Sequence, residues 1–95
     1  MAIKVLITRS GRPELFADLK PLLESLRRLA LAQPGYISGE TLVSHQDPNE
    51  YLVISTWASV PDWNNWFNHP ERISMQHGID ALLGEKTTYH IYGPE

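Results

Sequence analysis

Apolar and polar residues alternate along four stretches of the chain with the two-residue period of β-strands. In the first stretch, Ile3, Val5 and Ile7 fall on one face, whereas Leu6 and Thr8 fall on the other. The four stretches cover residues 2–10, 36–45, 51–57 and 87–92. Turn-forming Gly, Pro, Asn or Asp residues flank each of them, so the pattern predicts four strands.

Between residues 14 and 32 the apolar positions recur every three or four residues, as on one face of an amphipathic helix. Pro13 suits the first turn of such a helix. Pro21 lacks a backbone donor, and we expect it to kink the helix. The helix is expected to end at Pro34-Gly35.

A second helical region is predicted between the third and fourth strands. Ser59 is placed to cap the start of a short helix, in which Pro61 occupies the first turn. His69-Pro70 indicates a break and restart, and Gly84 closes the helical stretch that follows.

The predicted order is β-α-β-β-α-β, the ferredoxin-like arrangement of the α+β class. Asp47-Pro48 favours a type I turn, which makes residues 36–58 an antiparallel hairpin. We therefore expect a four-stranded antiparallel sheet with the helices on one face. Apolar residues occur on both faces of the strands, so the uncovered face is expected to pack against a second copy in a homodimer.

The composition agrees with one soluble domain spanning residues 1–95. Net charge is −3 and the basic residues are scattered, which makes nucleic acid an unexpected partner. No apolar run approaches the roughly 20 residues that a membrane span requires. The first residues lack the apolar region of a signal peptide, and there is no cysteine. A cytoplasmic protein is therefore expected.

Candidate chemistry is concentrated in aromatic and imidazole side chains. All three tryptophans, Trp57, Trp63 and Trp66, lie between residues 50 and 72. The chain carries no nucleotide-binding, zinc-protease or nucleophile-elbow motif. The four histidines have no i,i+4 spacing on one helix, so a metal site is not predicted. His69 and His77 lie near Trp66 in the sequence, where an imidazole could act as a base beside a flat aromatic ligand.

Several runs of the chain resemble the antibiotic biosynthesis monooxygenase family, whose members are small dimeric α+β barrels. The runs are Gln33 to Leu42, Tyr51 to Ser59, the Trp-x-x-Trp of residues 63–66, and Pro-Glu-Arg at 70–72. The resemblance implies a monooxygenase acting on a small molecule with molecular oxygen. Some members of the family oxidise aromatic phenols or quinols without a cofactor, and others degrade haem.

In the haem-degrading branch a tryptophan falls where Trp66 stands and a histidine falls close to His77, whereas Thr8 replaces an asparagine. We expect a cofactor-independent monooxygenase of a flat aromatic or quinol substrate, with no metal. Its catalytic bases would be His77 or His69. The substrate would be held by Trp66, Trp63, Phe67 and Thr8. Two alternatives stay open: a haem-binding or haem-degrading enzyme, and a non-catalytic dimeric domain that binds a small ligand.

Overall fold

The computed structural model describes residues 1–95, and its elements follow the predicted order with one difference. The elements are β1 (Ile3–Ser10), α1 (Pro13–Leu31), β2 (Tyr36–Val43), β3 (Glu50–Trp57), α2 (Val60–Phe67), α3 (Pro70–Leu83) and β4 (Thr88–Tyr92). The second helical region is therefore two helices, divided at the predicted break before Pro70. The ferredoxin-like fold is confirmed.

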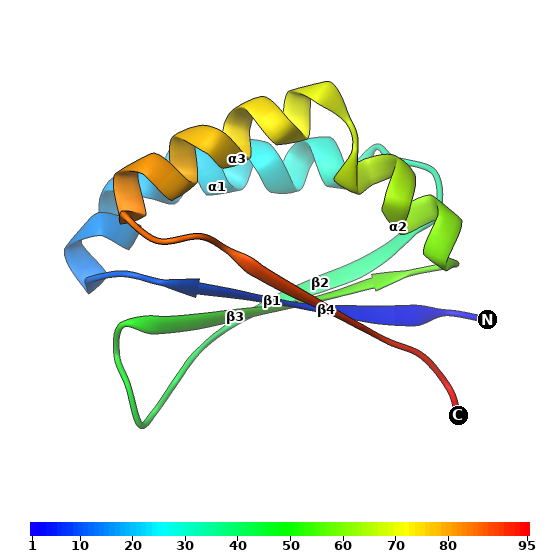
Figure 1. Ribbon diagram of the computed structural model, residues 1–95, viewed down its shortest axis with the longest axis horizontal. Helices are drawn as coiled ribbons and strands as arrows, with labels where there is room; N and C mark the ends of the chain where they lie inside the picture. Colours follow the sequence, from blue (N-terminus) through cyan, green and yellow to red (C-terminus); the bar gives the residue numbers. More distant parts are fainter.

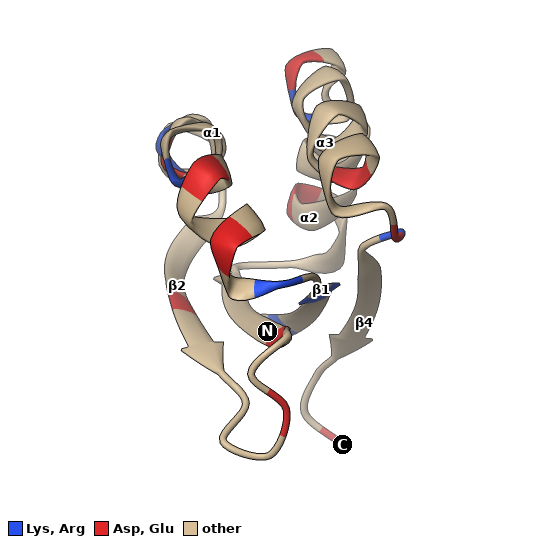
Figure 2. Ribbon diagram, turned by 90° about the vertical axis from the view of Figure 1, so that its left-hand side faces the viewer, with Lys and Arg blue, Asp and Glu red and all other residues tan.

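All neighbouring strands of the sheet are antiparallel, and their spatial order is β2-β3-β1-β4. The helices cover one face of this sheet, and the other face carries none (Figure 1). Viewed from the end, α1 lies toward the β2 side and α3 toward the β4 side (Figure 2). Strand β1, one of the two inner strands, therefore runs beneath both long helices.

The core fills the space between the helices and the covered face of the sheet. Alternation along β1 turns Ile3, Val5, Ile7 and Arg9 toward the helices, and each of these side chains is buried. The β1–β3 register places Arg9 opposite Tyr51. A charged residue thus takes a core position at the end of an otherwise apolar series.

Local sequence explains where the helices begin and end. Ser59 Oγ accepts a hydrogen bond from the Asp62 backbone N–H at 3.3 Å, as expected of an N-cap. His69 caps α3 in the same way, since its Nδ1 accepts from the backbone N–H of Glu71 at 3.2 Å. Gly84 ends α3 with φ of 75°, a left-handed conformation that glycine adopts without a steric cost. Pro21 is exposed, and α1 continues through it as a single helix.

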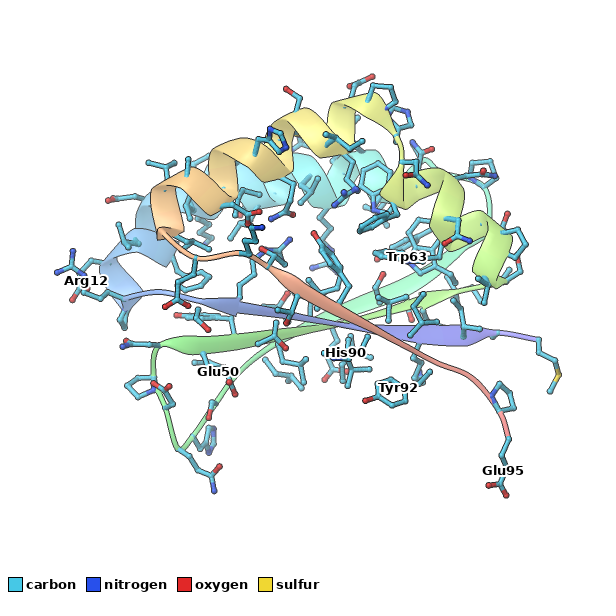
Figure 3. The ribbon with its side chains drawn as sticks, viewed as in Figure 1. Arg12, Glu50, Trp63, His90, Tyr92 and Glu95 are labelled. Atoms are coloured by element: carbon cyan, nitrogen blue, oxygen red, sulfur yellow. The ribbon has the colours of Figure 1, made fainter.

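The uncovered face of the sheet is partly apolar. The even-numbered positions of β1 and β3 point to this side, and Leu6, Leu52 and Ile54 on them are half-buried within one chain. His90 and Tyr92 of β4 project away from the helices (Figure 3). None of the three helices has the combination of length and apolar character that a membrane-spanning helix needs.

Candidate functional site

A cavity of about 130 Å³ lies between α1 and the covered face of the sheet. An apolar cavity of roughly 150 Å³ holds a benzene molecule, so this space suits a ligand of about one aromatic ring. Its walls come from β1, β2, β3, α1 and α2, and most of the lining side chains are apolar. The lining residues are Ile7, Arg9, Phe16, Leu23, Leu26, Arg27, Ala30, Tyr36, Gly39, Glu40, Thr41, Tyr51, Val53, Ser55 and Trp66.

Aromatic rings at two places define the walls of the cavity. Trp66 of α2 is 5% exposed and stacks on Trp57, with ring centroids 6.4 Å apart and planes 21° apart. Phe16 of α1 stacks on Tyr51 of β3 with centroids 3.8 Å apart. Stacked rings have few rotamers available, so they present stable flat surfaces to a bound ring.

Arg9 is the buried charge in this wall, with an exposed fraction of 7%. Its Nη2 donates to Oε1 of Gln76 at 3.2 Å, and its Nε has no hydrogen-bond partner. Burial lowers the pKa of Arg9 from its ordinary value, an effect that Arg72 reinforces and that Tyr89 and Asp80 partly offset. The site therefore contains a desolvated cation that the protein only partly satisfies.

A short polar network behind Arg9 holds Gln76 in place. Gln76 Nε2 donates to Asp80 Oδ1 at 2.8 Å and to Thr87 Oγ1 at 2.7 Å. Thr87 Oγ1 also donates to Asp80 Oδ1 at 2.8 Å. Because both amide hydrogens of Gln76 are engaged, its oxygen is oriented toward Arg9.

The cavity adjoins a surface groove between α1 and strands β2 and β3. The groove shares Phe16, Leu23, Arg27, Thr41 and Tyr51 with the cavity lining, and it continues past Lys20 and Glu24. A small molecule could reach the cavity along this groove without passing through the core.

Of the residues predicted to hold a substrate, the structure brings Trp66 to the cavity. Trp63 and Phe67 are also on α2, and their rings pack near Tyr89 of β4 at centroid distances of 5.9 and 5.2 Å. Figure 3 shows Trp63 between α2 and the sheet. Neither of these two residues lines the cavity. Thr8 lies on the uncovered face of the sheet, opposite Leu52 and Thr88.

The predicted catalytic histidines do not reach the cavity either. His77 is exposed on α3, and His69 is the N-cap of that helix, with its ring 5.8 Å from the Trp66 ring. No histidine occurs among the lining residues. The role of a base at His69 or His77 stays a prediction, and the geometry of the cavity does not favour it.

A model of a known family, described as antibiotic biosynthesis monooxygenase, matches residues 2–77 of the chain. The chain belongs to this family. The resemblance expected from the sequence is therefore confirmed.

Protein SchA of Streptomyces halstedii is 27% identical to this chain over 81 residues. The match covers 85% of this chain and 21% of SchA, so the chain spans about a fifth of the length of this curated relative. SchA is therefore much longer than the region that matches this chain.

Two solved structures illustrate the shared fold. A conserved protein from Methanosarcina mazei superposes with a TM-score of 0.88 and 18% identity, covering 100% of this chain and 94% of the other. SnoaB, a cofactor-independent oxygenase from Streptomyces nogalater, gives a TM-score of 0.81 and 14% identity. That match covers 99% of this chain and 93% of SnoaB. Identities this low establish the fold and leave the activity open.

Haem, the alternative cofactor that the resemblance implied, does not fit this cavity. The volume of about 130 Å³ is well below the roughly 300 Å³ at which pockets for larger ligands begin. No lining side chain is a histidine that could act as the axial ligand of the iron. His77, the expected iron ligand, is exposed outside the cavity.

Arg9 and Tyr51 are cavity residues that the sequence reasoning missed. The signal for Arg9 was present, because the alternation that places Ile3, Val5 and Ile7 on the buried face continues to Arg9. A charged residue at an inward strand position is uncommon and indicates a functional or structural role. Tyr51 shares that inward face through its pairing with Arg9.

Proposed function

We propose that this protein is a cofactor-independent monooxygenase that oxidises a small aromatic phenol or quinol in the cavity beneath α1. One observation carries the proposal: the cavity has aromatic walls, is the size of about one ring, and contains a buried cation. Membership of the antibiotic biosynthesis monooxygenase family supports the reaction class. The fold shared with SnoaB, itself a cofactor-independent oxygenase, is consistent with it.

The proposed reaction needs no external reductant, because the substrate supplies all four electrons that molecular oxygen accepts. A phenol loses its hydroxyl proton, and the phenolate passes one electron to oxygen. The resulting superoxide and phenoxyl radical combine at a ring carbon to form a C–O bond. The O–O bond then breaks as the C–H proton leaves that carbon, giving a quinone carbonyl and hydroxide. Hydroxide takes up a proton, so phenol and oxygen yield quinone and water.

In this scheme the protein binds and orients the ring rather than supplying redox chemistry. Trp66 forms one flat wall for the substrate, and the Phe16–Tyr51 pair faces the same space from α1 and β3. Trp63 and Phe67 act indirectly, by packing α2 against Tyr89 of β4. Holding the reactants in fixed geometry lowers the entropic part of the barrier.

We also propose that two copies of the chain pair through the uncovered face of the sheet. The support is the set of half-buried apolar side chains there, Leu6, Leu52 and Ile54, together with Tyr92, which is 56% exposed. An apolar sheet face of this kind is normally covered in a stable protein. Pairing would leave α1 and the entrance groove free on each copy.

Oxygen uptake tests the proposed activity. The wild-type protein is incubated with a panel of single-ring and fused-ring phenols and hydroquinones, and oxygen consumption and quinone absorbance are followed together. Trp66→Ala should lower kcat/KM by about tenfold or more, because it removes a stacking wall. His45→Ala, a change in the exposed turn between β2 and β3, is the matched control and should retain the wild-type rate. Saturable binding of aromatic ligands with no oxygen uptake across the panel would overturn the proposal and favour a non-catalytic binding domain.

A further inference from the structure

The guanidinium of Arg9 is buried in the cavity wall without a counter-ion in contact. Its recorded hydrogen-bond partner is the neutral amide of Gln76, and Nε has none. Arginine carries five N–H donors, so most of the donors of Arg9 have no protein acceptor. Removing a cation from water is unfavourable unless an anion or several acceptors compensate for the lost hydration.

The surrounding charged groups supply only part of that compensation. Asp80 of α3 directs Oδ1 at Gln76 and Thr87 instead of Arg9. Arg72, also on α3, is a second cation nearby, and the Tyr89 hydroxyl of β4 accepts a hydrogen bond from Arg72. On the other side of the cavity Arg27 and Glu40 carry opposite charges, and both are exposed. An excess of positive charge therefore remains at the buried end of the cavity.

We propose that Arg9 binds the ionised oxygen of a phenolic ligand, so that the cavity selects the phenolate over the neutral phenol. This inference rests on the proposed function and names the form in which its substrate is bound. An oxyanion on a single ring matches both the aromatic walls and the buried cation. Phenolate bound here accepts charge-assisted hydrogen bonds from the guanidinium, which are stronger than bonds between neutral groups.

Selection of the phenolate also accounts for a cavity without a histidine. A phenol that is bound as its anion has already released its proton to water, so no side chain in the cavity has to act as a base. The bound anion is the electron-rich form that the oxygen reaction requires. Arg9 is then a substrate-binding residue that holds the negative charge next to the ring.

Para-nitrophenol and nitrobenzene are matched probes for this inference. Both are single-ring compounds, the phenol becomes yellow when it ionises, and nitrobenzene cannot ionise. Binding of each is measured by titration, and the absorbance of bound para-nitrophenol is recorded as a function of pH. An opposite charge in contact lowers the pKa of a bound acid by about one to three units, so ionisation of para-nitrophenol should move to lower pH by that amount in the wild-type protein.

Arg9→Met should abolish this shift and weaken binding of the phenolate by about tenfold to a hundredfold, while nitrobenzene binding changes little. Arg9→Lys keeps the charge and should retain part of the shift, which also guards against misfolding of the methionine variant. Arg12→Met, the same change at an exposed arginine, is the matched control and should behave as wild type. The inference would be overturned if the pKa of bound para-nitrophenol shifted equally in the wild-type protein and in Arg9→Met, or if para-nitrophenol bound as the neutral phenol. The proposal that the cavity binds an aromatic ring would still stand. Failure of both probes to bind the wild-type protein would overturn this inference and the cavity-based function together.

Discussion

Arg9 of β1 and Gln76 of α3 are joined across the interior by a hydrogen bond of 3.2 Å from Nη2 to Oε1. This bond links the inner strand β1 to the helix that carries Asp80, and through Asp80 to Thr87 before β4. The polar network ends at the cavity wall, where the guanidinium of Arg9 is left with unused donors. The position of the cation is thus fixed by the fold, and its remaining hydrogen-bonding capacity is available to a ligand.

The two buried arginines should differ in their effect on stability. Arg72 donates through Nε to the Phe67 carbonyl at 2.7 Å and through Nη1 to Tyr89 at 3.0 Å, and its Cζ lies 4.4 Å from the Phe67 ring centroid. Arg72→Met should lower the free energy of unfolding by about 2–3 kcal/mol, because buried acceptors lose their donors. Arg9→Met should change it by less than about 1 kcal/mol, since the desolvation cost of a poorly satisfied cation is removed as well.

Chemical denaturation of both variants measures this difference. Because burial lowers the pKa of Arg9, the folded state disfavours the charged form, and that cost persists at every pH below the pKa of the folded state. The effect of Arg9→Met on stability should therefore be constant across the neutral range. If Arg9→Met lowered the free energy of unfolding as much as Arg72→Met, Arg9 would have a structural role.

His69 and His77, which the sequence predicted to be catalytic bases, should differ in the effects of their substitution. His77→Ala should leave oxygen uptake and aromatic binding unchanged, because the side chain is exposed on α3 and outside the cavity. His69→Ala should lower the free energy of unfolding by about 1 kcal/mol through loss of the N-cap hydrogen bond to Glu71. Steady-state kinetics and thermal unfolding separate the two effects. A large fall in kcat for His77→Ala would instead support His77 as the catalytic base.

Filling the cavity should block ligand binding without unfolding the protein. Ala30 of α1 lines the cavity, and Ala30→Leu adds apolar volume to the space that a ring would occupy. We expect an affinity for nitrobenzene at least tenfold lower and a loss of stability of no more than about 1–3 kcal/mol, the usual cost of adding methylenes to a core. Ala81→Leu on the exposed side of α3 is the control. Undiminished nitrobenzene binding to Ala30→Leu would place the ligand elsewhere.

The uncovered face of the sheet should determine the oligomeric state. Ile54→Lys introduces a charge at the centre of the half-buried apolar positions on that face, and it should convert a dimer into a monomer. Ile73→Lys, an identical change at an exposed position of α3, should leave the mass unaltered. Light scattering coupled to gel filtration gives both masses. A wild-type protein that is monomeric at all concentrations contradicts the proposed pairing.

The fold could be predicted because each local signal agrees with the whole. Ile3, Val5 and Ile7 alternate as the buried face of a strand, and Ser59 begins a helix at its observed N-cap. Pro21 removes one backbone hydrogen bond from α1, and the helix nevertheless continues through this exposed position. The expected kink there stays a prediction. Packing of the apolar face of α1 against the sheet outweighs that local cost.

The site could be predicted only in part, because proximity along the chain does not determine which side of a helix faces the cavity. His77 follows Trp66 by three turns of helical sequence, yet α3 turns His77 to solvent and Gln76 to the interior. Arg9 and Trp66 are far apart in sequence, and the sheet and α2 bring both to one cavity. Their meeting depends on tertiary packing, which the spacing of residues does not encode.

A crystal structure of the protein with bound para-nitrophenol tests the central claim most directly. The account predicts a ring in the cavity beneath α1, with one face toward Trp66 and the phenolic oxygen within hydrogen-bond distance of the Arg9 guanidinium. A ring bound outside this cavity, or one in the cavity with its oxygen turned away from Arg9, would contradict it.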